Sequence, residues 1–327
     1  MSTRPQLDRV VTVFGASGFL GRHVVTALVR HGYRVVAVTR RPELAHHLTT
    51  VGGLVGQVSV IQGNIRNRPS VERAVEGAFG VVNLVGILQE TARQGFDTVQ
   101  HKGAGLIAEA ARAAGVGRLV HVSAIGADSA SDAEYGRTKA LGERAVREAF
   151  PGAVILRPSI VFGPEDGFFN RFAAMARLTR VLPLISGETR FQPVYVGDVA
   201  EAVARGLDGG AAAGTTYELG GPAVHSFRGL MELMLKVTQR RRLLLPVPAP
   251  IARFQAKFLE KLPSAPLTPD QLKMLRRDNV VSDSARSEGR DLQGLGIAPT
   301  AMEVILPTYL WRFRATGEFA ERMPQPK

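Results

Sequence analysis

The sequence predicts an α/β protein built on a doubly wound parallel sheet, with helices on both faces and a smaller mixed domain towards the C-terminal end. Two observations predict this fold class. Apolar runs of strand length alternate with amphipathic helical stretches through the first two thirds of the chain. Strands that are buried on both faces of a parallel sheet have this composition, and the alternation implies right-handed β-α-β crossovers.

The expected elements follow one another in a regular order. A helix is expected from Phe19 to His31, and apolar side chains spaced four apart predict two more helices, one with Leu106, Ala110 and Ala114 and one with Leu141, Ala145 and Ala149. The segment QPVYVGDVAEAV predicts a strand followed by a helix. The expected strands are VVTVF (10–14), YRVVAVT (33–39), VSVIQG (58–63), GVVNLVG (80–86), RLVHVSA (118–124) and AVILRPS (153–159).

Composition excludes several classes of chemistry. The 327 residues contain no cysteine, so disulfides, thiol nucleophiles and cysteine-ligated metals are excluded within this chain. No stretch of about 18 apolar residues predicts a membrane span, and we expect no cleaved leader because a strand begins at Val10. The net charge is +12, and the 106 residues from 222 onwards carry 17 Lys or Arg against 10 Asp or Glu. A basic excess suits nucleic acid, an anionic membrane or an acidic partner, and it is equally typical of a solvated surface.

The stretch FGASGFLGRH carries the strongest functional signal. Three glycines follow a strand at a spacing of three and open a helix, which is the context of a dinucleotide loop in a Rossmann-like sheet. Glycine lets the backbone approach a pyrophosphate, whose charge the helix N-terminus favours. Cofactor contacts are therefore expected from Gly15, Ser17, Gly18, Phe19, Leu20 and Gly21.

The end of the second strand indicates which dinucleotide is bound. The run VVAVTRR places Arg40 and Arg41 where an acidic residue would contact the ribose 2′-hydroxyl of NAD. Arginine matches a 2′-phosphate, so NADPH (NADP) is the expected cofactor. The alternative is that both arginines only begin the next loop. Adjacent His46 and His47 are expected to be solvated, and no metal-ligand spacing is present.

The composition of the sequence changes after Gly163. Loop-forming segments such as GGAAAGTTYELGGP follow, and proline-rich joints separate short amphipathic pieces beyond Pro222. We expect an NAD(P)-binding domain over residues 1–222, with an excursion at about 163–190, and a smaller C-terminal docking domain over 223–327.

Several motifs resemble the short-chain dehydrogenase/reductase superfamily across about residues 10–200. They are GASGFLG, LVHVSAIG, YGRTK and LRPSIVFGP, in the order of that superfamily. Tyr135 and Lys139 lie four apart on one helical face, so the ammonium can lower the pKa of the phenol while Ser123 hydrogen-bonds a substrate carbonyl. The resemblance further implies cofactor contacts from Asn64, Ile65, Gly86, Ser123, Lys139 and Pro158.

A closer resemblance covers nearly the whole chain. The segments VVNLVGIL, REAFPGA, FGPEDGFFNRFA and FQPVYVGDVAEAV, with a basic, proline-punctuated tail, are similar to the atypical short-chain dehydrogenase accessory subunits of respiratory complex I, here in a bacterial form. That family implies a structural subunit that holds NADPH in the peripheral arm beside the membrane. It would lie on the cytoplasmic side of the bacterial inner membrane, in contact with other complex I subunits. No catalytic residue is then expected, and Tyr135 and Lys139 hold the cofactor.

Two alternatives remain. A soluble NADP-dependent reductase, dehydrogenase or epimerase would use Ser123, Tyr135 and Lys139 for catalysis. A cofactor-sensing regulator or RNA-associated member would use the fold as a dinucleotide-dependent binding module. The segment PIARFQAKFLEKLP predicts an amphipathic helix that lies on a partner, on anionic lipid headgroups or on its own domain. A single tryptophan and scattered basic residues give no expectation of nucleic-acid binding.

Overall fold

The chain folds into two compact units whose segments alternate along the sequence. The computed structural model describes residues 8–91, 94–248, 250 and 268–316. The first unit contains Met1–Pro158, Val196–Leu219 and Val281–Ala298, and the second contains Ser159–Tyr195, Gly220–Val280 and Pro299–Lys327. The predicted division into 1–222 and 223–327 cuts the chain once, whereas each unit is made of three segments. The predicted excursion at 163–190 lies within the second unit.

A seven-stranded parallel sheet forms the centre of the first unit, in the order β11-β6-β5-β4-β1-β2-β3. All six strands predicted from the sequence are confirmed. The segment TTYELGG, predicted as a loop, contains the seventh strand, because Tyr217 and Leu219 are buried and pair beside the sixth. The bounds are β1 Val10–Phe14, β2 Arg34–Thr39, β3 Val58–Gln62, β4 Gly80–Asn83, β5 Arg118–Val122, β6 Val154–Pro158 and β11 Thr216–Leu219.

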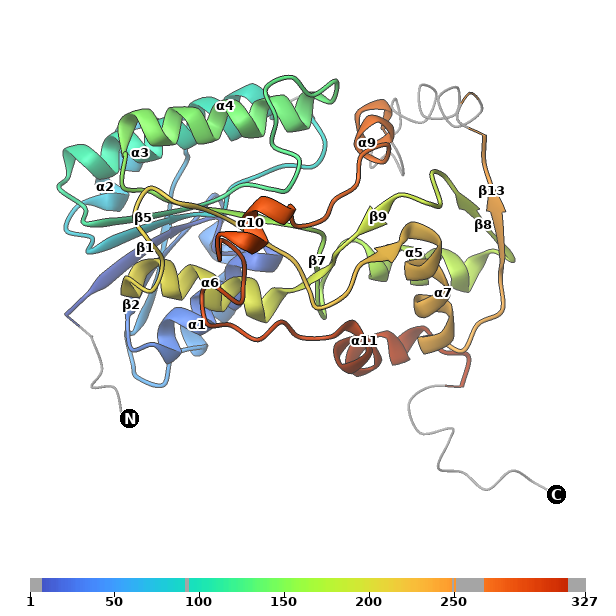
Figure 1. Ribbon diagram of the computed structural model, residues 1–327. Helices are drawn as coiled ribbons and strands as arrows, with labels where there is room; N and C mark the ends of the chain where they lie inside the picture. The colour runs from blue at the N-terminus through green and yellow to red at the C-terminus, as the bar shows by residue number, and fades with distance from the viewer. Residues whose placement is uncertain (1–7, 92–93, 249, 251–267, 317–327) are drawn as a thin grey trace. The chain divides into compact units, whose positions relative to one another are not determined.

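Helices cover both faces of this sheet, as predicted (Figure 1). On one face α1 (Phe19–Arg30) packs beside α6 (Val196–Asp208), and α6 also contacts β5 and β6. On the other lie α2 (Arg68–Val75), α3 (Gly103–Ala113) and α4 (Glu134–Ala149). Shorter helical pieces of the same unit are η1 Pro42–Leu44, η2 His46–Thr50, the π-helix η3 Asp97–Lys102 and α10 Asp283–Ser287.

The predicted stripes of α3 and α4 are confirmed in part. Ala110 is buried, and Leu106 and Ala149 pack against the core, whereas Ala114 is exposed and Ile107 is buried in addition. The two helices pack against each other as well as on the sheet, so small residues are needed between them. A Cβ atom at Gly142 would lie 2.1 Å from the carbonyl oxygen of Gln100, which shows how closely α4 approaches η3.

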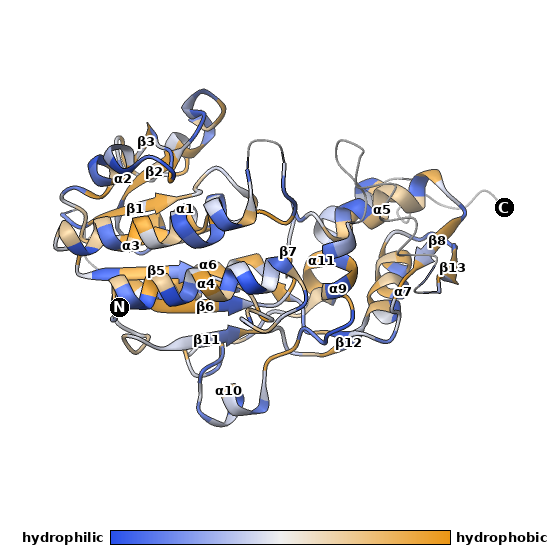
Figure 2. Cartoon of the chain, turned by 90° about the horizontal axis from the view of Figure 1, so that it is seen from above, coloured by the Kyte–Doolittle hydropathy of each residue, from blue (hydrophilic) through white to orange (hydrophobic). Residues whose placement is uncertain are grey.

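The apolar core of the first unit lies between its sheet and its helices. Figure 2 shows the hydrophobic colouring concentrated in the strands and on the inner sides of these helices. Phe14, Val81, Ile107 and Leu119 belong to one buried cluster formed by the sheet, α2, α3 and α4. Because this core fixes the carboxyl ends of the central strands, the loops that follow those strands are held in place.

The second unit has its own core of aromatic and aliphatic side chains. Phe162, Phe169, Phe227 and Leu306 are buried there among α5, α7 and α11. Its two-stranded pairs are β7 with β10, β9 with β12 and β8 with β13. The bounds are β7 Val161–Phe162, α5 Phe169–Leu178, β8 Val181–Leu184, β9 Arg190–Phe191, β10 Val194–Tyr195, β12 His225–Ser226, α7 Phe227–Val237, β13 Leu243–Pro246, α9 Pro269–Met274, α11 Met302–Leu310 and η4 Trp311–Phe313.

The remaining structural predictions have mixed outcomes. The strand and helix predicted in QPVYVGDVAEAV are confirmed as β10 and α6, and His46 and His47 are exposed. Within the described part of the chain, no helix combines the length and apolar character needed to cross a membrane, and no group of three metal-ligating side chains is found there. The predicted amphipathic helix in PIARFQAKFLEKLP lies outside the described residues.

Candidate functional site

The turn between β1 and α1 has the backbone geometry of a phosphate-binding loop. Gly15 has φ +85°, a conformation that favours glycine. A Cβ atom at Gly21 would lie 2.2 Å from the carbonyl oxygen of Gly15, so the loop and the first turn of α1 pack together only with glycine there. Gly18 begins the helix without a side-chain cap, and the first turn carries no acidic residue. The amides of this turn are therefore oriented to bind an anion.

Two arginines follow the end of β2 beside this loop. Ser17 and Thr39 are joined by a 3.0 Å hydrogen bond between their hydroxyl oxygens, which ties the glycine loop to the end of β2. Thr39 also accepts a hydrogen bond from the backbone N–H of Arg41, at 3.4 Å. Arg40 and Arg41 themselves are exposed. Their guanidinium groups are therefore accessible to a ligand from solvent.

Lys139 reaches from α4 to the ends of the central strands. Its side chain is buried, and Nζ donates a hydrogen bond to the carbonyl oxygen of Val122, at 3.3 Å. A Cβ atom at Gly86 would lie 3.2 Å from the same Nζ. The absence of a side chain at Gly86 therefore leaves space beside the ammonium group, and the cofactor contact predicted for Gly86 stays a prediction.

The electrostatics of Tyr135 differ from the prediction. Burial raises the pKa of Tyr135 to about 12, whereas the sequence predicted that Lys139 would lower it. Nζ of Lys139 lies 5.9 Å from the centre of the Tyr135 ring, and burial lowers the pKa of Lys139 to about 8, although the Glu143 carboxylate opposes this change. The same apolar surroundings disfavour the ionised form of each side chain, so the Tyr135 phenol is neutral near pH 7, while the ammonium form of Lys139 is destabilised.

Ser123 lies directly after β5 and precedes α4, the helix that carries Tyr135 and Lys139. Its backbone N–H donates to the carbonyl oxygen of Leu156 at 2.7 Å, which fixes its position. Its hydroxyl oxygen is buried and has no hydrogen-bond partner among the described residues. A buried hydroxyl without a partner is unfavourable, so a ligand that supplies one would be stabilised here.

The other predicted residues lie at the same edge of the sheet. Asn64 follows β3, and its side chain accepts from the backbone N–H of Arg66 at 3.1 Å, which holds the loop turn. Ile65 packs against the core cluster and against Gly103, so only part of its side chain faces outwards. Pro158 ends β6 and is buried. Phe19 and Leu20 form the first turn of α1 and are partly buried. Asn64, Ile65 and Pro158 therefore lie at the carboxyl ends of strands or just after them, and Phe19 and Leu20 lie at the start of the helix that follows the glycine loop.

Sequence reasoning missed a polar pair beneath this edge. Asn83 and His121 are direct neighbours on β4 and β5, and the Asn83 amide donates to Nδ1 of His121 at 3.1 Å. Oδ1 of Asn83 accepts from the backbone N–H of Val85 at 3.0 Å, which positions the segment that passes Gly15 and Gly86. Burial, with the charges of Lys139 and Arg147, lowers the pKa of His121 to about 3. His121 is therefore neutral. In the sequence, the polar residues near the ends of two predicted strands were the signal from which this pair could have been predicted.

A second missed feature is a buried ion pair behind Lys139. Glu143 is 1 % exposed, and Arg157 binds it with two hydrogen bonds of 2.8 and 2.7 Å. The pair joins α4 to β6. Because the Glu143 carboxylate is already neutralised by Arg157, it offers Lys139 only limited compensation for burial.

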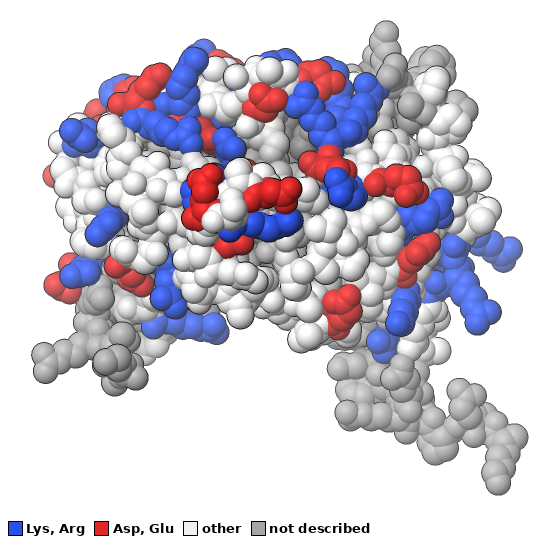
Figure 3. Space-filling model, viewed as in Figure 1, with Lys and Arg blue, Asp and Glu red and all other residues white. Residues whose placement is uncertain are grey.

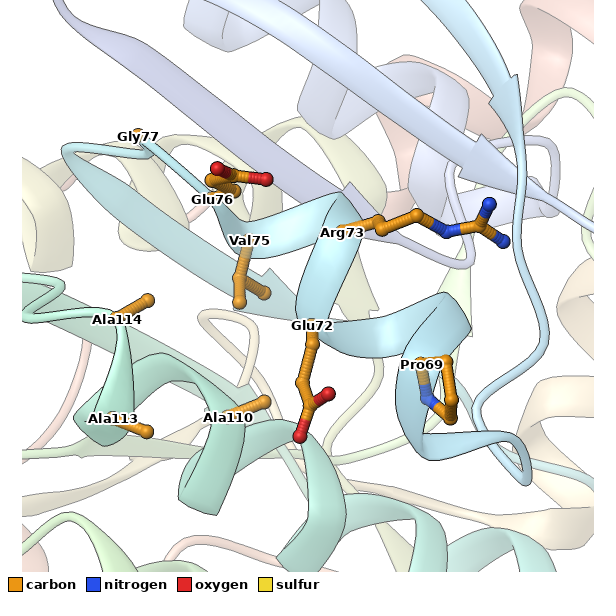
Figure 4. Close-up of a pocket in the computed structure, with 9 residues that line it drawn as sticks. All are labelled: Pro69, Glu72, Arg73, Val75, Glu76, Gly77, Ala110, Ala113 and Ala114. Atoms are coloured by element: carbon orange, nitrogen blue, oxygen red, sulfur yellow. The ribbon is translucent and has the colours of Figure 1, made fainter.

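A surface hollow of about 630 Å³ lies away from these groups, between α2 and α3 (Figure 4). Its lining includes Glu72 and Arg73 from α2, Glu76 directly after it, Ala110 from α3 and Ala114 directly after α3. None of the predicted cofactor residues lines it, and we assign it no function.

The fold and this arrangement of strand ends define a nucleotide-binding class of protein, and residues 11–220 match the NAD dependent epimerase/dehydratase family. The chain belongs to this family. It is 36 % identical over 321 residues to NADH dehydrogenase [ubiquinone] 1 alpha subcomplex subunit 9, mitochondrial, of Arabidopsis thaliana, covering 94 % of this chain and 79 % of that protein. It is 35 % identical over 191 residues to a ceramide reductase of Caulobacter vibrioides, covering 58 % of each.

Solved structures agree on the fold. UDP-glucose 4-epimerase from Thermotoga maritima superposes with a TM-score of 0.70 at 19 % identity, covering 94 % of this chain and 99 % of that one. Identity at this level indicates a shared fold and carries no statement about the substrate.

Proposed function

We propose that this chain is a structural accessory subunit of a proton-pumping NADH:quinone oxidoreductase, in which bound NADPH stabilises the subunit and its assembly and is not turned over. The observation that carries the proposal is the similarity to the Arabidopsis thaliana complex I subunit, which extends over 94 % of the chain rather than over the dinucleotide-binding part alone. Its partners are other subunits of the peripheral arm near the membrane, with anionic lipid headgroups near its basic C-terminal region. Its location is the cytoplasmic side of a bacterial inner membrane.

The state of Tyr135 supports a holding role rather than catalysis. A general acid or base works best with a pKa near the operating pH. Burial instead raises the pKa of Tyr135 to about 12. Lys139, whose pKa burial lowers to about 8, gains from any ligand oxygen that accepts its hydrogen bonds. The high pKa of Tyr135 argues against proton transfer by its hydroxyl, and Lys139 is placed to donate hydrogen bonds to a nicotinamide ribose.

Three features of the predicted cofactor residues support the proposal of a dinucleotide with a 2′-phosphate. The glycine loop has backbone positions that a Cβ atom would obstruct, and Gly86 leaves space beside Lys139. Arg40 and Arg41, exposed after β2, would hold the 2′-phosphate, to which guanidinium groups bind with two parallel hydrogen bonds. Gly15, Ser17, Gly18, Phe19, Leu20 and Gly21 would hold the pyrophosphate, with Asn64 and Ile65 at the adenine and Ser123, Lys139 and Pro158 near the nicotinamide.

A double variant, Arg40→Ala with Arg41→Ala, tests the choice of cofactor. We expect its affinity for NADPH to fall at least about tenfold, because charge-assisted hydrogen bonds of about 1.5–3 kcal/mol are lost. Its affinity for NADH should stay within about twofold, since no 2′-phosphate is present. Titration calorimetry with both nucleotides measures this. The matched control is Arg30→Ala with Arg34→Ala, which removes two exposed arginines elsewhere on the first unit. Equal losses for both nucleotides would contradict the NADPH assignment.

A second candidate function is that of a soluble NADP-dependent reductase, favoured by the similarity to a ceramide reductase over 191 residues. Ser123, Tyr135 and Lys139 would then be catalytic. Tyr135→Phe separates the two: a subunit that only holds its cofactor keeps bound NADPH and its complex, whereas a reductase loses its product in cells.

Affinity purification of the tagged chain from detergent-solubilised membranes of its own organism tests the proposal as a whole. We expect the other subunits of the oxidoreductase in the purified fraction, with NADPH bound to the chain. Recovery of the chain as a free soluble monomer, with no such subunits, would contradict the proposal.

A further inference from the structure

The pair β8 and β13 in the second unit presents an apolar face that no described residue covers. The strands run parallel, with Leu243 beside Val181 and Leu245 beside Pro183. Alternate residues point to opposite faces of a strand, so these four side chains share one face. Leu243 is 61 % exposed, Leu245 50 % and Val181 41 %. The intervening side chains face the core of the unit.

Arginines gather where these two strands begin. Arg180 directly precedes β8, and Arg241 and Arg242 precede β13. Because the strands are parallel, both starts lie at the same end of the face. The backbone N–H of Leu243 donates to the carbonyl oxygen of Arg180 at 3.1 Å, which fixes this closeness. Arg177 lies in the last turn of α5, next to Leu178, which is 80 % exposed.

Among the described residues, no salt bridge joins these arginines to an acidic side chain. Burial and the charges of Arg242 and Arg177 lower the pKa of Arg240, so positive charges lie close to its guanidinium group. In the part of the chain that the structure describes, ion pairs of this unit involve other arginines, such as Arg190 with Asp278, and none involves the arginines at the strand starts. Figure 3 shows basic side chains gathered at the edge where Figure 1 draws the beginning of β13.

We propose that this surface, made of Val181, Pro183, Leu243 and Leu245 with Leu178, Arg177, Arg180, Arg241 and Arg242 at one end, docks on a bilayer of anionic phospholipid. Guanidinium groups bind lipid phosphates with two hydrogen bonds. The apolar side chains next to them then enter the layer just below the headgroups, as the apolar side of an interfacial element does. Excess positive charge at one end and apolar surface beside it are complementary to phosphate above acyl chains.

A lipid surface fits this face better than a second protein does. Protein interfaces carry about one hydrogen bond for each 100–200 Å². The four outward side chains of β8 and β13 are valine, proline and two leucines, which offer a protein partner no side-chain hydrogen bond. Lipid acyl chains need no hydrogen bonds from the protein. The cations lie together at one end, as a phosphate layer requires.

This inference deepens the lipid contact named in the proposed function, and it rests on that function only for the membrane at which the contact occurs. It adds a defined surface, part of which comes from residues 177–183 rather than from the basic C-terminal region alone.

Flotation of the purified full-length chain with vesicles tests the inference. We expect the chain to float with vesicles of phosphatidylcholine and phosphatidylglycerol, to remain behind with phosphatidylcholine alone, and to dissociate as salt is raised. Arg180→Glu with Arg241→Glu should reduce the bound fraction at least about tenfold, because each basic residue near an anionic surface contributes about fivefold. Leu243→Ser with Leu245→Ser should weaken binding at low salt as well, since it removes apolar contacts.

Matched controls distinguish binding through this surface from the effect of net charge and from non-specific hydrophobic binding. Arg30→Glu with Arg34→Glu makes the same charge change on the first unit, and Leu54→Ser removes another exposed leucine. Both controls should float like the wild type, and all variants should match its thermal unfolding. Equal weakening in control and test variants would overturn the inference.

The outcomes distinguish this inference from the proposed function. If the chain co-purifies with the oxidoreductase but does not float with anionic vesicles, the lipid surface is wrong and the proposed function stands. If, in addition, the test variants lose co-purification, the face binds a protein subunit instead. Flotation of a chain that never associates with the complex would support the surface alone.

Discussion

Replacing Lys139 by methionine tests how the nucleotide-free chain tolerates a buried ammonium group. The side chain is 5 % exposed, and burial lowers its pKa from 10.5 to about 8 although the Glu143 carboxylate acts in the opposite direction. The difference corresponds to about 3 kcal/mol, since each pKa unit is worth about 1.4 kcal/mol. Methionine fills a similar volume without the charge. We therefore expect Lys139→Met to increase the free energy of unfolding by about 1–3 kcal/mol near pH 7. The increase is below the full value because the variant loses the hydrogen bond from Lys139 to the carbonyl oxygen of Val122.

The effect should depend on pH in a defined direction. Because the pKa of Lys139 is lower in the folded chain, the unfolded chain binds more protons between about pH 8 and pH 10.5. Wild-type stability from this group therefore rises with pH across that window, whereas the methionine variant lacks the rise. The advantage of the variant is largest below about pH 8 and disappears towards pH 10.5.

Urea unfolding followed by circular dichroism, without nucleotide and at several pH values, measures both effects. Lys236→Met is the matched control, because Lys236 is an exposed lysine on α7. With NADPH added, the order should reverse, since wild-type Lys139 then has a ligand oxygen to bind. A Lys139→Met variant that is less stable than the wild type without nucleotide, or whose advantage is the same at all pH values, would refute the reasoning.

Two further predictions concern the glycine loop and the opposite face of the sheet. Gly21→Ala should abolish NADPH binding in titration calorimetry and lower the thermal midpoint, because its Cβ atom would lie 2.2 Å from the carbonyl oxygen of Gly15; Gly53→Ala, with no atom within 4 Å of the added carbon, should change neither. The pKa of His31 is raised, because hydrogen bonds and charges of two flanking carboxylates outweigh burial, which acts to lower it. Stability from His31 is therefore full below about pH 6.5 and lost as pH rises through the raised pKa, and His31→Gln should remove this loss in urea titrations; an unchanged pH profile would count against the ion pairs.

The central sheet was predictable because its signal is local. Six strands, α1 and the glycine loop follow from apolar runs and turn residues that lie next to each other in the sequence. The strand β11 was not predictable in the same way. Its run TYEL is short and polar, and it becomes a strand because β6 offers an open edge beside it.

The candidate site rests on residues named from the sequence, whose binding roles stay predictions, while its electrostatics could not be predicted. Motif order was enough to point to Gly15, Gly86, Ser123 and Lys139. The raised pKa of Tyr135 depends on how many apolar groups surround the ring, and spacing along a helix does not contain that information.

Side chains that meet only in the folded chain were missed for a related reason. Asn83 and His121 lie 38 residues apart and meet because β4 and β5 are neighbours in register. The apolar face of β8 and β13 depends on a pairing between segments about 60 residues apart, and neither strand alone predicts it.

The fate of bound NADPH in the assembled oxidoreductase tests the central claim most directly. The complex would be purified with this chain in place and mixed with quinone in the absence of NADH, and the fluorescence of bound NADPH would be followed. A nucleotide that is held for stability predicts constant NADPH fluorescence, which falls only when the chain is unfolded and releases it. Oxidation of the bound NADPH by quinone at a rate comparable with turnover of the complex would contradict the account.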